Sequence, residues 1–104
     1  MVIINPISGT GSPGDLEGKV RAALEGEDRE VEFRYSERPG HCGVLASEAV
    51  KRRLYAVIAV GGDGTINEVA SALRGTSVNM GILPRGSGNG LARHLDMSLS
   101  LIHI

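Results

Sequence analysis

The chain has 104 residues, enough for one small domain with a modest hydrophobic core. Aromatic residues make up only 3% of it and the net charge is −1, which argues against a platform for stacking single-stranded nucleic acid and against any strong attraction to nucleic acid. The single cysteine, Cys42, excludes an intrachain disulfide, and no CxxC or HExxH pattern indicates a zinc site.

The first apolar run, Met1–Ile4, stops at Asn5-Pro6 and is too short for a signal sequence or a membrane span. We therefore expect a soluble, cytoplasmic protein. Four segments of the chain have the apolar pattern and length of strands. They are Val2–Asn5, Arg29–Tyr35, Ala56–Val60 and Met80–Leu83.

Two of these segments have informative patterns. Arg29–Tyr35 alternates, with Val31, Phe33 and Tyr35 on one face, which predicts a half-buried strand at an edge. Ala56–Val60 is continuously apolar, which is typical of a central parallel strand covered on both faces.

Segments of helical periodicity separate these strands. Leu16–Leu24 and Cys42–Leu54 each place apolar residues on one face, and Cys42–Leu54 ends in basic residues that suit a helix C-terminus. Alternating strands and helices predict an α/β fold of three layers, with a mainly parallel sheet and helices on both faces. Gly88–Leu95 reads as a further helix that would end a domain spanning residues 1–95. The segment 96–104 has no turn or clear periodicity, so we expect either a fifth strand or an atypical, truncated end.

Most of the 15 glycines fall into three clusters that lie at or after strands. Ligands of open α/β sheets bind outside the carboxyl ends of the strands, so the three loops are expected to converge on one edge. The clusters are Gly9, Gly11 and Gly14; Gly61, Gly62 and Gly64; and Gly81, Gly86, Gly88 and Gly90.

The middle cluster, Gly61-Gly62-Asp63-Gly64-Thr65, follows a strand and precedes a helix. A helix N-terminus and glycines suit a phosphate, because the amides are free and no Cβ obstructs the approach. Asp63 would repel a phosphate unless a metal ion or a reacting hydroxyl lay between them. Thr65 and Glu68 also match a capping box, which is a purely structural alternative.

The outer loops carry weaker signals. Gly9, Gly11 and Gly14 satisfy GxGxxG, but the strand ends too far ahead of them for a good dinucleotide fingerprint. Ser87 could cap a helix or bind a phosphate. Ser36, at the end of the second strand, could reach a nucleotide or simply form a turn.

The loop sequences together resemble the diacylglycerol kinase catalytic domain, whose superfamily includes bacterial lipid kinases, sphingosine kinases and ceramide kinases. The resemblance runs from about Val2 to about Leu95, and the more distant NAD kinases share the Gly-Gly-Asp-Gly element. The matching motifs are Asn5-Pro6-x-Ser8-Gly9, Gly61–Val69 and Pro84-x-Gly86-Ser87-Gly88-Asn89 followed by Leu91-Ala92-Arg93.

The resemblance implies a two-domain kinase of lipid metabolism that uses ATP and Mg²⁺. Its N-terminal α/β domain, similar to that of NAD kinases, would hold the nucleotide. A C-terminal β-rich domain, absent from this chain, would supply much of the lipid site. The implied partners are ATP and a lipid acceptor such as diacylglycerol or a sphingoid base. Peripheral membrane contact and a homodimer are compatible with the resemblance, and the chain alone is expected to be inactive.

By motif match, Asp63 would lie beside the Mg²⁺ and the acceptor hydroxyl and act in catalysis, and the resemblance leaves a carboxylate of the second domain as the alternative base. The implied nucleotide-binding residues are Asn5, Ser8, Gly9, Ser36, Gly62, Asp63, Gly64, Thr65, Ile66, Asn67, Glu68 and Ser87.

Three other functions compete with this interpretation. An NAD kinase would use the same chemistry on a soluble acceptor, and a Rossmann-type redox domain would use the GxGxxG loop but leaves Gly61–Thr65 unexplained. A non-catalytic nucleotide-binding module is the third.

Overall fold

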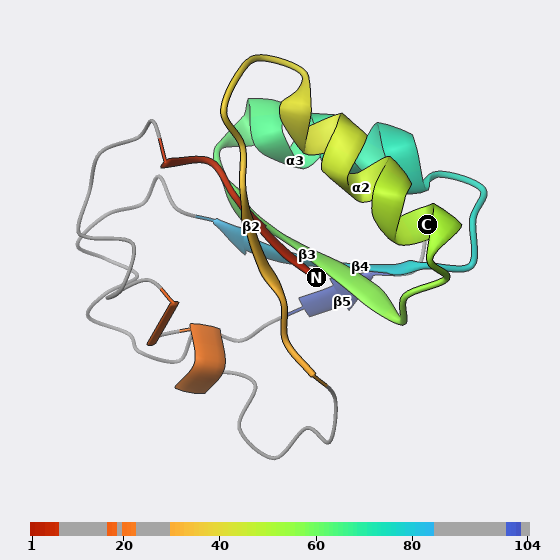
Figure 1. Cartoon of the computed structure of the whole chain (residues 1–104), viewed down its shortest axis with the longest axis horizontal. Helices are drawn as coiled ribbons and strands as arrows, with labels where there is room; N and C mark the ends of the chain where they lie inside the picture. Colours follow the sequence, from red (N-terminus) through yellow and green to blue (C-terminus); the bar gives the residue numbers. More distant parts are fainter. Residues whose placement is uncertain (7–16, 19, 23–29, 85–99, 103–104) are drawn as a thin grey trace.

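The computed structural model describes residues 1–6, 17–18, 20–22, 30–84 and 100–102. They form one five-stranded sheet in the order β2-β1-β3-β4-β5 (Figure 1). The first four strands are parallel, and β5 runs antiparallel to β4. The strands are β1 (Val2–Ile4), β2 (Phe33–Tyr35), β3 (Ala56–Gly61), β4 (Asn79–Pro84) and β5 (Ser100–Ile102).

The four strands predicted from apolar runs are therefore confirmed, although β2 is shorter than Arg29–Tyr35. As predicted, β2 lies at the end of the strand order, and Val31, Phe33 and Tyr35 pack together against the same apolar cluster. The segment 96–104, for which a fifth strand was one expectation, contributes β5 to the sheet.

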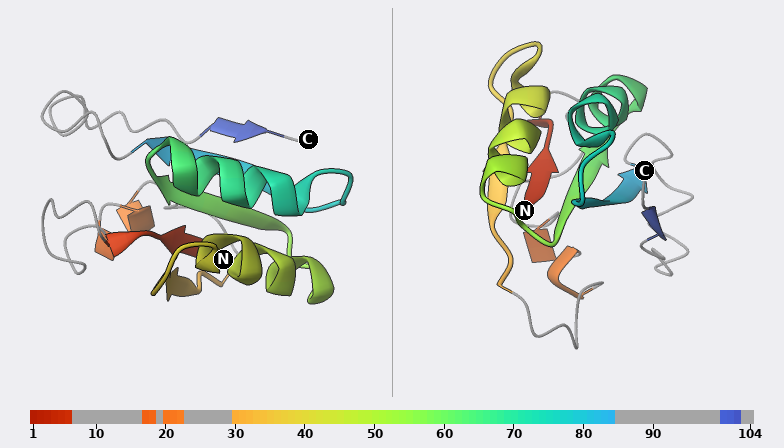
Figure 2. Two further views of the ribbon diagram at one scale, coloured as in Figure 1. Left: turned by 90° about the horizontal axis from the view of Figure 1, so that it is seen from above. Right: turned by 90° about the vertical axis from the view of Figure 1, so that its right-hand side faces the viewer.

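Helices cover both faces of the sheet, which confirms the predicted three layers. Helices α2 (His41–Lys51) and α3 (Asp63–Leu73) lie side by side on one face, and helical residues 17–18 and 20–22 lie on the other (Figure 2). These residues fall within the predicted helix Leu16–Leu24, while the predicted helix Gly88–Leu95 lies outside the described residues. No helix in the described part of the chain is long and apolar enough to cross a bilayer.

The predicted end of the second helix at Leu54 is wrong, because α2 stops at Lys51. Arg53 adopts a left-handed conformation with φ 55°, which breaks the helix. The Arg53 amide donates to the carbonyl of Val50, and the Leu54 amide donates to that of Ala49. This pair of bonds is a Schellman motif, with arginine at the position that glycine usually occupies.

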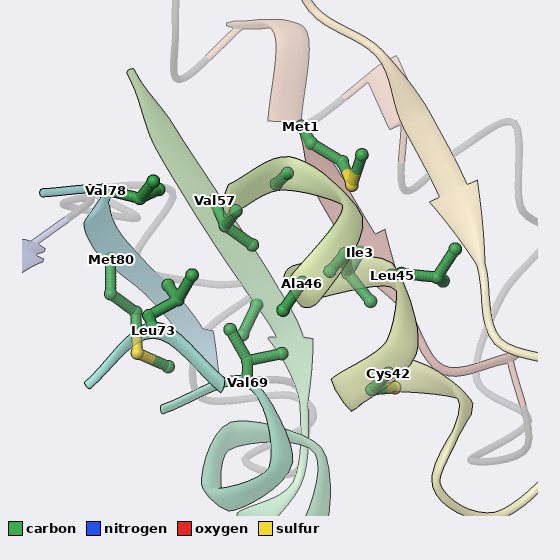
Figure 3. Close-up of a cluster of buried hydrophobic side chains, with 12 residues drawn as sticks. Met1, Ile3, Cys42, Leu45, Ala46, Val57, Val69, Leu73, Val78 and Met80 are labelled. Atoms are coloured by element: carbon green, nitrogen blue, oxygen red, sulfur yellow. The ribbon is translucent and has the colours of Figure 1, made fainter. Parts of the chain in front are cut away.

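The core has two halves because β1 and β3 alternate their side chains between the two faces of the sheet. Ile3 and Val57 point toward α2 and α3 (Figure 3), and Ala59 belongs to the same cluster. Ile4 and Val60 belong to the cluster on the opposite face. Burial on both faces explains the continuous apolar sequence of β3. The larger half comprises Met1, Ile3, Cys42, Leu45, Ala46, Ala49, Val57, Ala59, Val69, Leu73, Val78 and Met80.

Candidate functional site

The strand order creates a topological switch point between β1 and β3. The chain passes from β1 to β2 on one side and then returns to β3 on the other side of β1. Connections leave the carboxyl ends of these two strands in opposite directions, and α/β proteins commonly bind their ligands at such a switch point. The register aligns Ile4 with both Tyr35 and Val60, so the carboxyl ends of β2, β1 and β3 are level at one edge.

Two polar side chains meet across this switch point. Asn5 directly follows β1, and its backbone amide donates to the carbonyl of Val60 over 3.3 Å. Its side-chain Nδ2 donates over 3.2 Å to Oγ1 of Thr65, which is only 4% exposed. The first residue after β1 is therefore hydrogen-bonded to the first turn of α3.

The structure excludes the capping-box alternative for Thr65 and Glu68. Helix α3 begins at Asp63, with Gly62 as its N-cap and no capping bond from a side chain. Thr65 lies inside the helix, and its hydroxyl accepts the hydrogen bond from Asn5. The N-cap is therefore Gly62, three residues earlier than the Thr65 N-cap that the Thr65–Glu68 spacing indicates.

The glycines of this loop differ in what the packing requires of them. A Cβ added at Gly61 would lie 2.8 Å from both Cβ and Oγ1 of Thr65, so a side chain there would collide with α3. At Gly62 and Gly64, an added Cβ would have no described heavy atom within 4 Å. Packing among the described residues thus explains why position 61 is a glycine, but not why positions 62 and 64 are. The surface next to Gly62 and Gly64 is open.

The N-terminus of α3 faces this open surface. The amides of Asp63, Gly64 and Thr65 precede the first helical hydrogen bond, which the Ile66 amide donates to the carbonyl of Gly62. Gly62, Asp63 and Gly64 are all exposed. Free amides and the positive end of the helix dipole make this surface suitable for an anion. The Asp63 carboxylate is exposed beside it.

The predicted site residues beyond this surface have different surroundings. Asn67 is exposed and Ile66 is half-buried, while Oε1 of Glu68 is buried without a hydrogen-bond partner among the described residues. The described residues contain no group of three or more His, Cys, Asp or Glu side chains that could hold a metal. Three further predicted residues, Ser8, Gly9 and Ser87, lie outside the described residues.

Ser36 lies at the same edge, directly after β2. It is 6% exposed, and its amide donates over 2.9 Å to the carbonyl of Ile4. In the turn that follows, the amide of Glu37 donates over 2.8 Å to Nδ1 of His41. We did not predict this contact, because a single histidine after glycine has no recognisable spacing. The Gly-His pair at the start of α2 is the only sequence signal for it.

Charged side chains connect the β2 region to α2. Arg34 contacts Glu48 at 2.7 Å and Glu32 at 3.2 Å, and Arg52 contacts the same two carboxylates at 3.2 and 2.9 Å. The Arg34 guanidinium is the main cause that lowers the pKa of Glu48, and Arg52 is the main cause for Glu32. These partly exposed pairs orient β2 but are each expected to contribute little stability.

On the opposite face, the hydroxyl of Tyr35 donates to the carboxylate of Glu17. Burial, and then the Glu17 carboxylate, raise the pKa of Tyr35 to about 12. The guanidinium of Arg21 lies 4.7 Å from the ring centre of Phe33. The helical residues of this face therefore contact two residues of β2.

The chain is similar to lipid kinases along most of its length. Residues 1–103 match the family described as the diacylglycerol kinase catalytic domain. A protein named as a lipid kinase in Streptococcus pneumoniae is 35% identical over 94% of this chain and 34% of its own length. A YegS-like lipid kinase of Klebsiella pneumoniae is 42% identical over 85% of this chain and 31% of its own length. A diacylglycerol kinase of Staphylococcus haemolyticus is 34% identical over 92% of this chain and 30% of its own length.

A similar fold occurs in a crystal structure described as a diacylglycerol kinase from Bacillus anthracis. The TM-score is 0.69 at 20% sequence identity, over 93% of this chain and 35% of that one. The chain spans about a third of the length of the relatives it matches. The family match also extends beyond Leu95, where the resemblance of the motifs ends.

Proposed function

Because the chain belongs to the diacylglycerol kinase catalytic domain family, we propose that it is the nucleotide-binding part of an ATP-dependent lipid kinase. The proposed reaction transfers the γ-phosphoryl group of ATP to a hydroxyl of a lipid such as diacylglycerol or a sphingoid base. One observation carries the proposal. The open N-terminus of α3 lies at the switch point between β1 and β3. Packing among the described residues would accept a side chain at positions 62 and 64, so it does not explain the two glycines there.

The phosphates of ATP are proposed to bind to the free amides of Asp63, Gly64 and Thr65. Each amide bonded to a charged phosphate would contribute on the order of 1.5–3 kcal/mol. The bond between Asn5 and Thr65 supports this role, because it fixes the first turn of α3 against β1 before any ligand arrives. Positioning of this kind lowers the cost of ordering the site when the nucleotide binds.

The proposed chemistry is an in-line phosphoryl transfer. The lipid hydroxyl oxygen forms a bond to the γ-phosphorus, the bond from that phosphorus to the β–γ bridging oxygen breaks, and ADP leaves. Positioning and charge neutralisation supply most of the catalysis. Asp63 would orient the hydroxyl or accept its proton, unless a carboxylate of another domain does so.

The described residues fit a magnesium ion that arrives with the nucleotide. Mg²⁺ retains several waters and is usually held by one or two carboxylates together with substrate phosphates. Asp63 would supply one carboxylate oxygen, directly or through water, and the ion would neutralise phosphate charge when bound. A lipid acceptor also implies peripheral contact with a membrane, which we include in the proposal.

Nucleotide binding is tested by calorimetric titration of the 104-residue chain with Mg-ATP, with NADH as the comparison ligand. We expect weak, saturable binding of Mg-ATP and no turnover by the chain alone. Saturable binding of NADH without Mg-ATP would instead support a redox domain.

The acceptor is tested by fusing the chain to the C-terminal portion of a lipid kinase relative. Thin-layer chromatography then follows phosphate transfer to diacylglycerol, sphingosine and NAD. Phosphorylation of NAD alone would favour an NAD kinase, and binding without any transfer would favour a non-catalytic module.

A further inference from the structure

The turn between β2 and α2 is closed by a side chain. Nδ1 of His41 accepts a 2.8 Å hydrogen bond from the amide of Glu37, the residue directly after Ser36. The backbone amide of His41 donates over 3.1 Å to the carbonyl of Arg38, and Gly40 supplies a left-handed residue with φ 83°. Main chain and side chain of His41 thus both bond the turn that connects Ser36 to α2.

The imidazole of His41 bonds the turn before α2 and not the amides of the helix itself. The N-cap of α2 is Gly40, which makes no side-chain capping bond. The amide of Glu37 lies in an exposed turn beyond the last sheet bond, which the Ser36 amide makes to Ile4. His41 therefore holds the chain where it leaves the sheet.

The hydrogen bond also selects one form of the imidazole. An Nδ1 atom that accepts a hydrogen bond carries no proton, so a neutral ring must carry its proton on Nε2. The half-buried ring is then held in one orientation at the edge where β2, β1 and β3 end.

We propose that His41 is a positioning residue for nucleotide binding, which acts through Glu37 to fix Ser36 at the end of β2, where it adjoins the end of β1. This inference rests on the proposed function, because Ser36 is a nucleotide contact only if the edge binds a nucleotide. His41 itself need not touch the ligand. Loss of its bond would release the turn and increase the ordering cost of binding.

The test compares three chains by calorimetric titration with Mg-ATP: wild type, His41→Ala and His41→Asn. Alanine removes the acceptor, whereas Oδ1 of asparagine occupies nearly the position of Nδ1 and can accept the same bond. We expect the dissociation constant to rise about fivefold in His41→Ala, as for the loss of one hydrogen bond, and to stay within about twofold of wild type in His41→Asn.

A second measurement does not depend on ligand. Long-range ¹⁵N–¹H spectra of the wild-type chain should show an unprotonated Nδ1 and a protonated Nε2 for His41. A proton on Nδ1, or equal Mg-ATP affinity in wild type and His41→Ala, overturns the inference while leaving the proposed function in place. If wild type binds no Mg-ATP at all, the proposed function fails first and this role of His41 fails with it.

Discussion

Asn5 and Thr65 are 60 positions apart in the chain, yet Nδ2 of Asn5 donates a 3.2 Å hydrogen bond to Oγ1 of Thr65. The bond crosses from the end of β1 to the first turn of α3, at the switch point of the strand order. It is buried on the Thr65 side, where the residue is 4% exposed. The geometry of the proposed phosphate site therefore depends on a contact between two distant parts of the sequence.

Removing either partner of this bond should destabilise the chain. We expect Asn5→Ala and Thr65→Val each to lower the free energy of unfolding by about 1 kcal/mol, because a buried polar group loses its partner. The double variant should cost less than the sum of the two, with a coupling of about 0.5–1.5 kcal/mol. Urea unfolding of the four chains measures the cycle, and strict additivity would show that the bond contributes nothing.

Neighbouring glycines should respond differently to the same substitution. Gly61→Ala places a Cβ 2.8 Å from two atoms of Thr65, so we expect a loss of about 1–3 kcal/mol from overpacking. Gly62→Ala meets open space and should lose less than about 1 kcal/mol, which reflects the poor capping preference of alanine. Thermal unfolding distinguishes the two, and equal losses would contradict the packing described here.

Gly64→Ala should separate stability from binding. Position 64 lies in the first turn of α3 with space for a methyl group, so alanine should raise the free energy of unfolding by about 0.5 kcal/mol. The same methyl group would obstruct the approach of a phosphate to the free amides, and Mg-ATP affinity should fall at least tenfold.

Gly18→Ala is the matched control for this substitution. Gly18 is also helical, with no described atom within 4 Å of an added Cβ. It follows Glu17, which accepts a hydrogen bond from Tyr35 on the face of the sheet opposite α3. This variant should leave Mg-ATP affinity unchanged. If Gly64→Ala binds Mg-ATP as tightly as Gly18→Ala does, the phosphates do not bind at the N-terminus of α3.

Asp63→Asn tests the proposed catalytic carboxylate. In the fusion with a relative's C-terminal portion, we expect the rate of lipid phosphorylation to fall by about 10²-fold or more, as for loss of a general base. The free energy of unfolding should change little, because Asp63 is exposed. A fusion that stays fully active with asparagine at this position would remove Asp63 from the mechanism.

Ionisation of the Tyr35 hydroxyl should lower the free energy of unfolding of the chain at high pH. Its pKa is raised to about 12 in the folded chain from an ordinary value of 10.0, so the neutral phenol is favoured by folding. Stability from this group is complete below pH 10 and is lost as the pH rises toward 12. Urea unfolding between pH 9 and pH 11.5 should therefore show a steeper decline for wild type than for Tyr35→Phe, and parallel declines would contradict the assignment.

The apolar pattern predicted the sheet because burial on both faces acts locally along each strand. The run Ala56–Val60 marks the central strand, and the alternation around Phe33 marks the edge strand. The start of α3 was predicted wrongly, after Thr65 and not at Asp63, because the Thr65–Glu68 spacing fits a capping box. The hydroxyl of Thr65 bonds instead to Asn5, a partner that no local pattern reveals.

Other features escaped prediction for similar reasons. The end of α2 depends on Arg53 in a left-handed conformation that usually indicates glycine, so the basic residues indicated a C-terminal region but not the last helical residue. The bond between Glu37 and His41 has no recognisable spacing. The roles of Ser8, Gly9 and Ser87 stay predictions from motif resemblance.

The pairing of β1 with β3 has a consequence for folding. The Ile58 amide donates over 2.8 Å to the carbonyl of Met1, and the same pairing aligns Ile4 with Val60 and so places Asn5 close to Thr65. Closing a loop of this length is entropically costly and slow compared with forming α2 or α3 alone. In refolding experiments, capacity for Mg-ATP should therefore appear only in the final cooperative phase, well after helical circular dichroism has begun to recover.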